Sequence, residues 1–149
     1  MSFKLYLISL AVVIIDQLSK YYVVRNFALG ESVPVVENIF RLTYILNPGA
    51  AFGMMEGSRW LFIAIAAAVL AGGWLLRREV LAGDMFLRYG AALFMGGAVG
   101  NVIDRARTGL VVDFFDFRIW PVFNVADIAI CIGVGAVVWS LYNSEFLKS

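Results

Sequence analysis

The chain has 149 residues and a mass of 16.5 kDa, with 62% hydrophobic and 15% charged residues and a mean hydropathy of +0.84. Ordinary globular domains contain about 45 to 50% hydrophobic residues and about 25% charged residues. A protein core of this size cannot bury so much apolar surface, so lipid must cover part of this chain. The net charge of +1 argues against a nucleic-acid-binding protein that relies on many phosphate contacts. The sequence has no histidine, which excludes Ser/His/Asp triads, Cys/His dyads and zinc sites of the HExxH type. Any catalysis must use carboxylates, lysine, hydroxyls or the backbone.

The sequence contains four apolar stretches. A membrane-spanning helix needs about 20 mainly apolar residues, and each stretch reaches this length when about one turn of flanking residues is included. The first stretch follows Lys4 as in a secretory signal, but no small-x-small cleavage site comes after it, so we expect a retained helix. We predict an all-α membrane protein with four transmembrane helices and a small β-sheet outside them, built as a single integral membrane domain, 1–149. The predicted transmembrane helices cover 3–24, 59–77, 87–105 and 124–143.

Small residues recur every four positions along three of these helices, which predicts close packing of the backbones. They are Ala64, Ala68 and Gly72 in the second helix, Ala92, Gly96 and Gly100 in the third, and Cys131 and Gly135 in the fourth. The stripe on the third helix continues to Asp104, and the one on the fourth helix begins at Asp127. Both carboxylates, and Cys131, are therefore expected on packing faces rather than toward lipid.

The polar segment between the first and second helices, 26–57, is predicted to form the sheet. Residues 32–37 and 40–46 are rich in valine and aromatic residues and indicate two strands that turn near Glu37 and Asn38. The run 47–53 (NPGAAFG) follows, and its small residues suit close approach of the backbone to a ligand. A second connecting segment, 110–123, carries four aromatic residues and is expected to dock at the membrane interface.

Five aspartates lie at or near the predicted helix ends on the side of the sheet: Asp16, Asp104, Asp113, Asp116 and Asp127. In a chain without histidine they indicate carboxylate chemistry. Two close carboxylates do not both ionise cheaply, so one holds a proton and the pair offers a base together with an acid. Such a pair can activate water against a peptide carbonyl without a metal.

Most of these aspartates also have a structural interpretation in the local sequence. Three pairs have the spacing of a structural contact: Asp16 with Lys20, Asp104 with Arg105, and Asn124 with Asp127 as a helix cap. Asp116 is expected either to be solvated or to take part in the site. Asp113 has no capping or pairing partner nearby, which favours a functional role for it.

Five motifs together resemble a known family. Asp16-x-x-x-Lys20 and the segments 47–53, 100–105 (GNVIDR), 111–114 (VVDF) and 123–127 (FNVAD) occur in the order seen in bacterial lipoprotein signal peptidase, also called signal peptidase II. The resemblance covers nearly the whole chain. It implies a membrane aspartic endopeptidase that removes signal peptides from prolipoproteins by cleaving before the diacylglyceryl-modified cysteine. Asp113 and Asp127 are then the catalytic dyad that activates water.

The resemblance also implies roles for the surrounding residues and a place in the cell. The residues implied to bind substrate or orient the dyad are Asn47, Asn101, Arg105 and Asn124, and those implied to form a supporting polar network are Asp16, Lys20 and Asp104. No cofactor or metal is expected, and the expected partners are diacylglyceryl-modified prolipoproteins and membrane lipid. The resemblance implies a monomer in the bacterial cytoplasmic membrane, with cytoplasmic termini, an extracytoplasmic β-sheet and the site toward the outer leaflet. The basic residues alone leave this orientation open, because five lie with the termini and seven on the other side.

Two other classes of protein fit parts of the sequence. Intramembrane Asp16, Lys20, Asp104 and Asp127 are also typical of a proton-coupled transporter or channel subunit. However, four short helices without visible inverted repeats leave little room for alternating access. A noncatalytic membrane chaperone that binds its partner through the sheet edge is the third interpretation.

Overall fold

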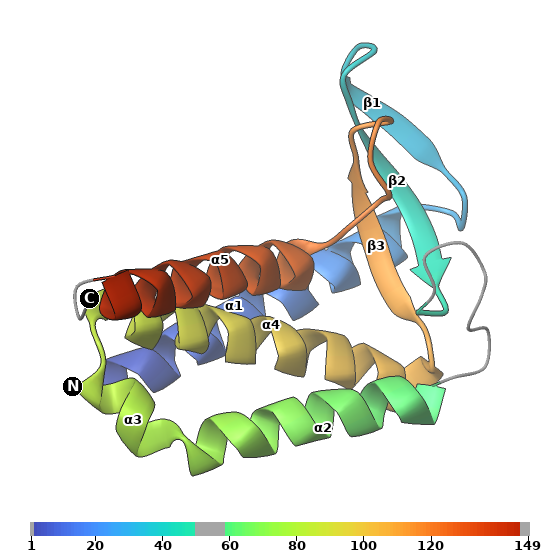
Figure 1. The fold of residues 1–149 in the computed structure, drawn as a ribbon. Helices are drawn as coiled ribbons and strands as arrows, with labels where there is room; N and C mark the ends of the chain where they lie inside the picture. Colours follow the sequence, from blue (N-terminus) through green and yellow to red (C-terminus); the bar gives the residue numbers. More distant parts are fainter. Residues whose placement is uncertain (1, 50–58, 147–149) are drawn as a thin grey trace.

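The structure is a computed structural model that describes residues 2–49 and 59–146. Its elements in chain order are α1 (Ser2–Asn26), β1 (Ser32–Val36), β2 (Phe40–Asn47), α2 (Arg59–Leu75), α3 (Arg77–Ala82), α4 (Met85–Thr108), β3 (Val111–Asp116) and α5 (Val125–Phe146). The long helices form a bundle, and the sheet projects from the end of the bundle opposite α3 and the start of α1 (Figure 1). This confirms the predicted fold class, a helical membrane protein with a small sheet.

Three helical segments among the described residues are long and apolar enough to cross a membrane: Phe3–Asn26, Met85–Thr108 and Val125–Ser144. The fourth predicted span is shorter than expected, since α2 ends at Leu75 and a separate short helix, α3, follows it. Its 17 residues extend over about 26 Å, slightly less than the hydrocarbon thickness of about 30 Å. Large apolar side chains such as Leu18, Trp74 and Trp139 lie exposed on the helix surfaces, as lipid contact requires.

Helix α4 is the centre of the bundle and packs against α1, α2 and α5. The predicted stripe of Ala92, Gly96 and Gly100 is buried on this helix. Gly97 beside it faces α5 so closely that a Cβ atom would overlap the Ala126 carbonyl oxygen and lie 2.8 Å from Ile130 Cγ1. Small residues thus allow the two backbones to touch, as predicted for this helix.

The predicted stripes on the second and fourth helices are wrong. Ala64 and Ala68 are exposed, a Cβ on Gly72 would meet nothing within 4 Å, and Cys131 and Gly135 are also exposed. Helix α5 instead packs through its buried residues Ala126, Ala129 and Gly133. These positions follow the helical repeat of 3.6 residues, whereas a strict four-residue step from Asp127 drifts off the packing face.

The sheet has three antiparallel strands in the order β1-β2-β3, where two strands were predicted. The predicted turn is confirmed, and Asn38 takes the positive φ of 63° that asparagine tolerates there. The third strand comes from the segment predicted only to dock at the interface. Its register places Val111 opposite Asn47 and Asp113 opposite Ile45. β3 therefore brings the segment between α4 and α5 onto the hairpin that follows α1.

A small apolar cluster fixes the sheet to the bundle. Val23 near the end of α1, Tyr44 in β2 and Phe114 in β3 form its buried centre. Because Phe114 is adjacent to Asp113 in β3, this cluster sets the position of that carboxylate relative to the helices.

Candidate active site

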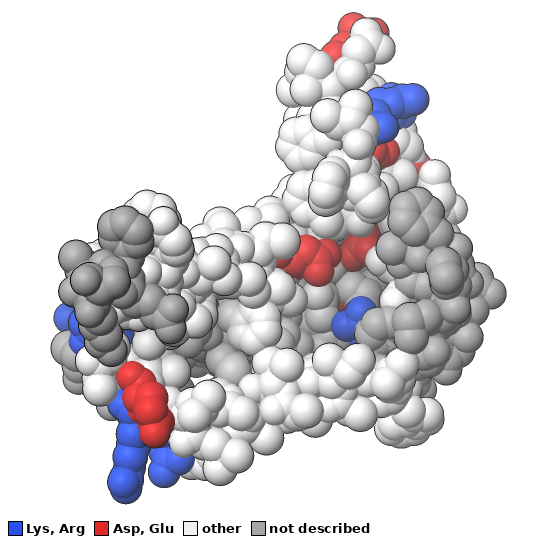
Figure 2. Space-filling view, in the orientation of Figure 1, with Lys and Arg blue, Asp and Glu red and all other residues white. Residues whose placement is uncertain are grey.

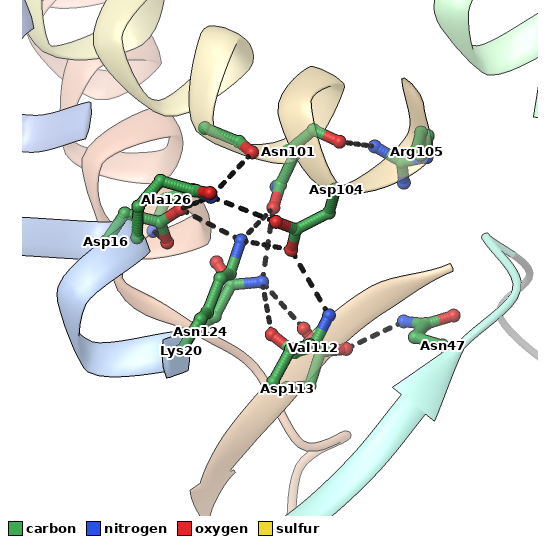
Figure 3. Close-up of polar contacts among 12 residues, drawn as sticks. Asp16, Lys20, Asn47, Asn101, Asp104, Arg105, Val112, Asp113, Asn124 and Ala126 are labelled. Atoms are coloured by element: carbon green, nitrogen blue, oxygen red, sulfur yellow. Dashed lines mark hydrogen bonds and ion pairs between the residues drawn. The ribbon is translucent and has the colours of Figure 1, made fainter. Parts of the chain in front are cut away.

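Asp113 is almost completely buried, with 1% of its surface exposed. Its carboxylate accepts two amide hydrogen bonds, from Asn47 Nδ2 at 2.9 Å and from Asn124 Nδ2 at 2.6 Å (Figure 3). The pKa of Asp113 is raised to about 6, mainly by burial; the charge of Asp127 also raises it, whereas the two amides and Lys20 lower it. Asp113 therefore holds a proton more readily than an ordinary aspartate does.

Asn124 and Asp127 form the helix cap predicted from their spacing. The Asn124 side-chain oxygen accepts from the Asp127 backbone N–H at 2.9 Å, and the Asp127 carboxylate accepts from the Asn124 backbone N–H at 3.1 Å. The same Asn124 side chain donates to Asp113. One asparagine thus holds both carboxylates, one by its side chain and the other by its backbone.

Asn101 of α4 connects this cap to the interior of the bundle. Its Nδ2 donates to Asp127 Oδ1 at 2.8 Å, and its Oδ1 accepts from Asn124 Nδ2 at 3.2 Å and from Lys20 Nζ at 3.0 Å. An ammonium group only donates hydrogen bonds, so Lys20 fixes which end of the Asn101 amide is oxygen. The amide nitrogen must then point at Asp127.

Lys20 lies between two buried carboxylates. Its Nζ is 2.9 Å from Asp16 Oδ2, which confirms the predicted pair, and 2.8 Å from Asp104 Oδ2. The predicted pairing of Asp104 with Arg105 is wrong. Neighbouring residues on a helix point about 100° apart, so Asp104 turns inward to Lys20 while Arg105 faces another direction.

Gln17 is a member of this network that the sequence analysis missed. Its Nε2 lies 2.9 Å from Asp104 Oδ1, 3.2 Å from Asp16 Oδ2 and 3.2 Å from the Gly100 carbonyl oxygen. It supplies hydrogen-bond donors to a cluster with two carboxylates and one ammonium. A signal was present in the sequence, because a glutamine inside a predicted membrane helix needs polar partners.

A crevice of about 270 Å³ opens beside the carboxylates, between α2, α4 and α5. Asn101, Arg105 and Asp127 form its polar wall, opposite Ile65 and Val69 of α2. Acidic and basic atoms gather in a hollow between the sheet and the helices (Figure 2). An amide, a guanidinium and a carboxylate that face one crevice can bind a polar group and exchange protons with it.

The nine residues named as site residues from the sequence form one connected region. Asp116 lies apart from it, on the sheet, where it accepts from Thr43 Oγ1 and from the Arg118 backbone N–H, each at 2.8 Å. Of the motif 47–53, residues 50–53 lie outside the described residues. Within 2–49 and 59–146, the structure contains no group of three or more Asp, Glu, Cys or His side chains arranged to hold a metal ion.

Comparisons with known proteins show the family of this chain. The family model for signal peptidase (SPase) II matches residues 8–143. The lipoprotein signal peptidase of Pelotomaculum thermopropionicum is 46% identical over 141 residues, covering 95% of this chain and 93% of that protein. The lipoprotein signal peptidase of Moorella thermoacetica is 47% identical over 135 residues, covering 91% of this chain and 90% of that protein.

A solved structure has the same fold. A bacterial membrane enzyme determined at 2.3 Å resolution superimposes with a TM-score of 0.89 at 32% identity, covering 98% of this chain and 92% of that one. The match includes the sheet as well as the helices, since it extends over nearly the whole chain. The chain therefore belongs to the signal peptidase II family, the peptidases that process prolipoproteins.

Proposed function

We propose that this chain is an aspartic endopeptidase that cleaves prolipoproteins immediately before the diacylglyceryl-modified cysteine, with Asp113 and Asp127 as its catalytic pair. The observation that carries the proposal is the unlike environment of two carboxylates held by one residue, Asn124. Asp113 is buried and has a raised pKa, while Asp127 lines the open crevice. Pairs of carboxylates whose environments differ in this way divide the roles of acid and base.

In the proposed reaction Asp127 is the base and Asp113 the acid. Asp127 takes a proton from water as the water oxygen attacks the peptide carbonyl carbon, and Asp113 gives its proton to the carbonyl oxygen. The tetrahedral intermediate then returns that proton to Asp113, while Asp127 passes its own to the departing nitrogen as the C–N bond breaks. The products are a signal peptide with a new carboxyl end and a lipoprotein with a free cysteine amine.

The neighbouring residues keep the pair in position for these steps. Asn47 and Asn124 hold the Asp113 carboxylate, and Asn101 holds Asp127. Arg105 lines the crevice, where its guanidinium can bind a carbonyl oxygen of the substrate. The buried network of Asp16, Lys20 and Asp104 maintains the orientation of Asn101.

The proposal includes a place for the enzyme in the cell. We place it as a single membrane domain and a monomer in the bacterial cytoplasmic membrane, with cytoplasmic termini and the carboxylates toward the outer leaflet. Diacylglyceryl chains then lie against the apolar helices while the scissile bond reaches the crevice near the sheet. The exposed side chains of Ile119 and Trp120, next to the sheet, suit contact with the membrane interface on that side.

The test is cleavage of a synthetic prolipoprotein, with and without the diacylglyceryl group, by purified protein. We expect lipid-dependent cleavage that falls at least about a thousandfold in Asp113→Asn and in Asp127→Asn, because each substitution removes a group that moves protons in the reaction. Asp116→Asn is the matched control in the same strand and should cleave at nearly the normal rate.

Near-normal turnover in either dyad variant overturns the catalytic assignment. A folded wild type that fails to cleave, under conditions where a known enzyme of the family is active, favours the transport or binding interpretations instead. Thermal unfolding of each variant separates loss of activity from loss of fold.

Chelation provides an independent test of the mechanism. We expect the cleavage rate to be unchanged by EDTA, because the proposed water activation uses only the two carboxylates. Cleavage measured before and after EDTA treatment checks this. Activity that is lost with EDTA and restored by zinc contradicts the mechanism.

A further inference from the structure

A larger groove opens at the end of the bundle away from the carboxylates. It has a volume of about 660 Å³ and lies between α1 and α2, with α4 beneath it. Its walls are mainly apolar, with contributions from Leu5 and Val13 of α1, Val69 and Gly73 of α2, and Ala91 and Met95 of α4. It is separate from the crevice beside Asp127, although Val69 and Phe94 line both.

Hydrocarbon is the filling that suits this groove. Apolar cavities of this kind stay free of water. If such a cavity is empty, the side chains that line it lose dispersion contacts with neighbouring atoms. Two of the helices that bound the groove, α1 and α4, are long and apolar enough to cross a membrane, and in a bilayer lipid chains surround them. An acyl chain that lies between α1 and α2 restores those contacts.

The far end of the groove is lined by cations. Arg77, at the start of α3, and Arg88, in the first turns of α4, both line it, and Glu79 is the one acidic residue in its lining among the described residues. The Arg77 guanidinium lies over the Trp74 ring at 4.5 Å from its centroid and donates from Nη1 to the Trp74 carbonyl oxygen at 2.8 Å. Tryptophan and arginine at a helix end are typical of the level of the lipid headgroups.

The charge around this end favours an anionic headgroup. Within the groove lining itself, the two basic residues Arg77 and Arg88 accompany one acidic residue, Glu79, whereas Lys4 and Arg78 are outside that lining. The Asp84 carboxylate is already engaged, because it accepts from the Leu87 backbone N–H and from Ser140 Oγ, each at 2.8 Å. Basic pockets between membrane helices bind anionic lipid headgroups in this way.

We propose that this groove binds one phospholipid of the bilayer with an anionic headgroup, its acyl chain between α1 and α2 and its phosphate against Arg77 and Arg88. The site is distinct from the carboxylates and does not depend on the proposed reaction. Its occupant is a resident lipid that completes the packing of α2, rather than a substrate.

The experiment measures lipid retention by native mass spectrometry. Purified full-length protein, freed of lipid in detergent, is mixed with equal amounts of phosphatidylglycerol and phosphatidylcholine that carry identical acyl chains. The variant Arg77→Gln/Arg88→Gln removes the two proposed headgroup ligands. Lys4→Gln/Arg78→Gln is the matched control, because it removes the same charge at the same end from residues outside the groove lining.

We expect the wild type and the control to retain one phosphatidylglycerol with about a tenfold preference, and Arg77→Gln/Arg88→Gln to lose that preference. Ala91→Phe, which fills the groove, should reduce retention of both lipids. If that variant fails to fold, the two arginine substitutions at the mouth of the groove still test the site.

Three outcomes overturn the proposal. Equal retention of the two lipids by the wild type excludes an anionic headgroup site. A preference that survives Arg77→Gln/Arg88→Gln places the headgroup elsewhere on the protein. Displacement of the bound phosphatidylglycerol by a synthetic signal peptide assigns the groove to the substrate's apolar segment instead.

Discussion

At the scale of single residues, Asp113 experiences opposing influences on its charge. Burial disfavours its ionised form, while the amides of Asn47 and Asn124 stabilise that form. Burial is the larger effect, and the pKa rises from an ordinary value of 3.8 to about 6. Between these two values the folded protein binds a proton at Asp113 that the unfolded chain releases. The stability of the protein therefore falls as the pH rises through this interval and is then constant with respect to Asp113.

This linkage predicts how Asp113→Asn changes stability. The neutral amide avoids the cost of burying a charge, so the variant should gain stability relative to the wild type as the pH is raised from 4 to 8, by up to about 3 kcal/mol. Thermal unfolding in detergent at several pH values measures the difference. Asp116→Asn, which changes a less buried carboxylate in the same strand, is the matched control. A difference between Asp113→Asn and the wild type that is independent of pH contradicts the prediction.

The sequence predicted the site at this scale better than it predicted the contacts within it. Of the five aspartates that indicated a site, Asp116 lies apart, and the other four belong to one connected network. Partners that depend on the direction of a side chain around a helix were predicted less well. Asp104 pairs with Lys20 from another helix rather than with its neighbour Arg105. Such pairings depend on how two helices are rotated against each other, which no local pattern encodes.

At the scale of helices, the contact of α4 with α5 depends on positions where the two backbones touch. Gly97 faces the Ala126 carbonyl oxygen, and Gly133 faces the Gly90 carbonyl oxygen at 2.6 Å from where its Cβ would be. A backbone oxygen has no alternative rotamer, so a methyl group at either position must push the helices apart. Because Asp127 is one residue after Ala126, such a shift also moves the proposed base.

Gly97→Ala should therefore lower both stability and activity. We expect a loss of about 1 to 3 kcal/mol from overpacking, together with slower cleavage. Gly72→Ala is the matched control, because a Cβ on Gly72 meets nothing within 4 Å. Unfolding in detergent and the cleavage assay measure the two effects. Equal stability of the two variants indicates that α4 and α5 are not packed as tightly as the structure has them.

The elements differ in how far local sequence determines them. The helices and the hairpin follow from apolar runs and alternation, whereas β3 was missed although its residues 111–116 are mostly apolar or aromatic. A strand is defined by its partner, and the partner of β3, the strand β2, is separated from it in the chain by three helices, α2, α3 and α4. Its pairing with β2 is fixed by packing of Phe114 against Val23 and Tyr44, which only the assembled bundle provides.

At the scale of the whole molecule, the sheet and α3 lie at opposite ends of the bundle (Figure 1). The proposed orientation therefore predicts opposite accessibility for the two ends. With Cys131 replaced by alanine, Glu37→Cys in the hairpin turn should react with a membrane-impermeant maleimide in intact cells. Ala82→Cys at the end of α3 should react only after the membrane is permeabilised. Mass shifts of the labelled protein measure both reactions, and the reverse pattern refutes cytoplasmic termini.

The pairing of β2 with β3 has a consequence for biosynthesis. The hairpin emerges from the ribosome soon after α1, but the strand that completes the sheet follows only after α2, α3 and α4 have been made. During that interval one edge of β2 has unpaired N–H and C=O groups and is open to pairing with other chains. The Asn47 side chain likewise lacks its hydrogen-bond acceptor until Asp113 has been made. The nascent protein thus lacks both proposed catalytic residues and is vulnerable to misassembly until its second half has been inserted, and proteolysis of stalled chains should begin in the hairpin.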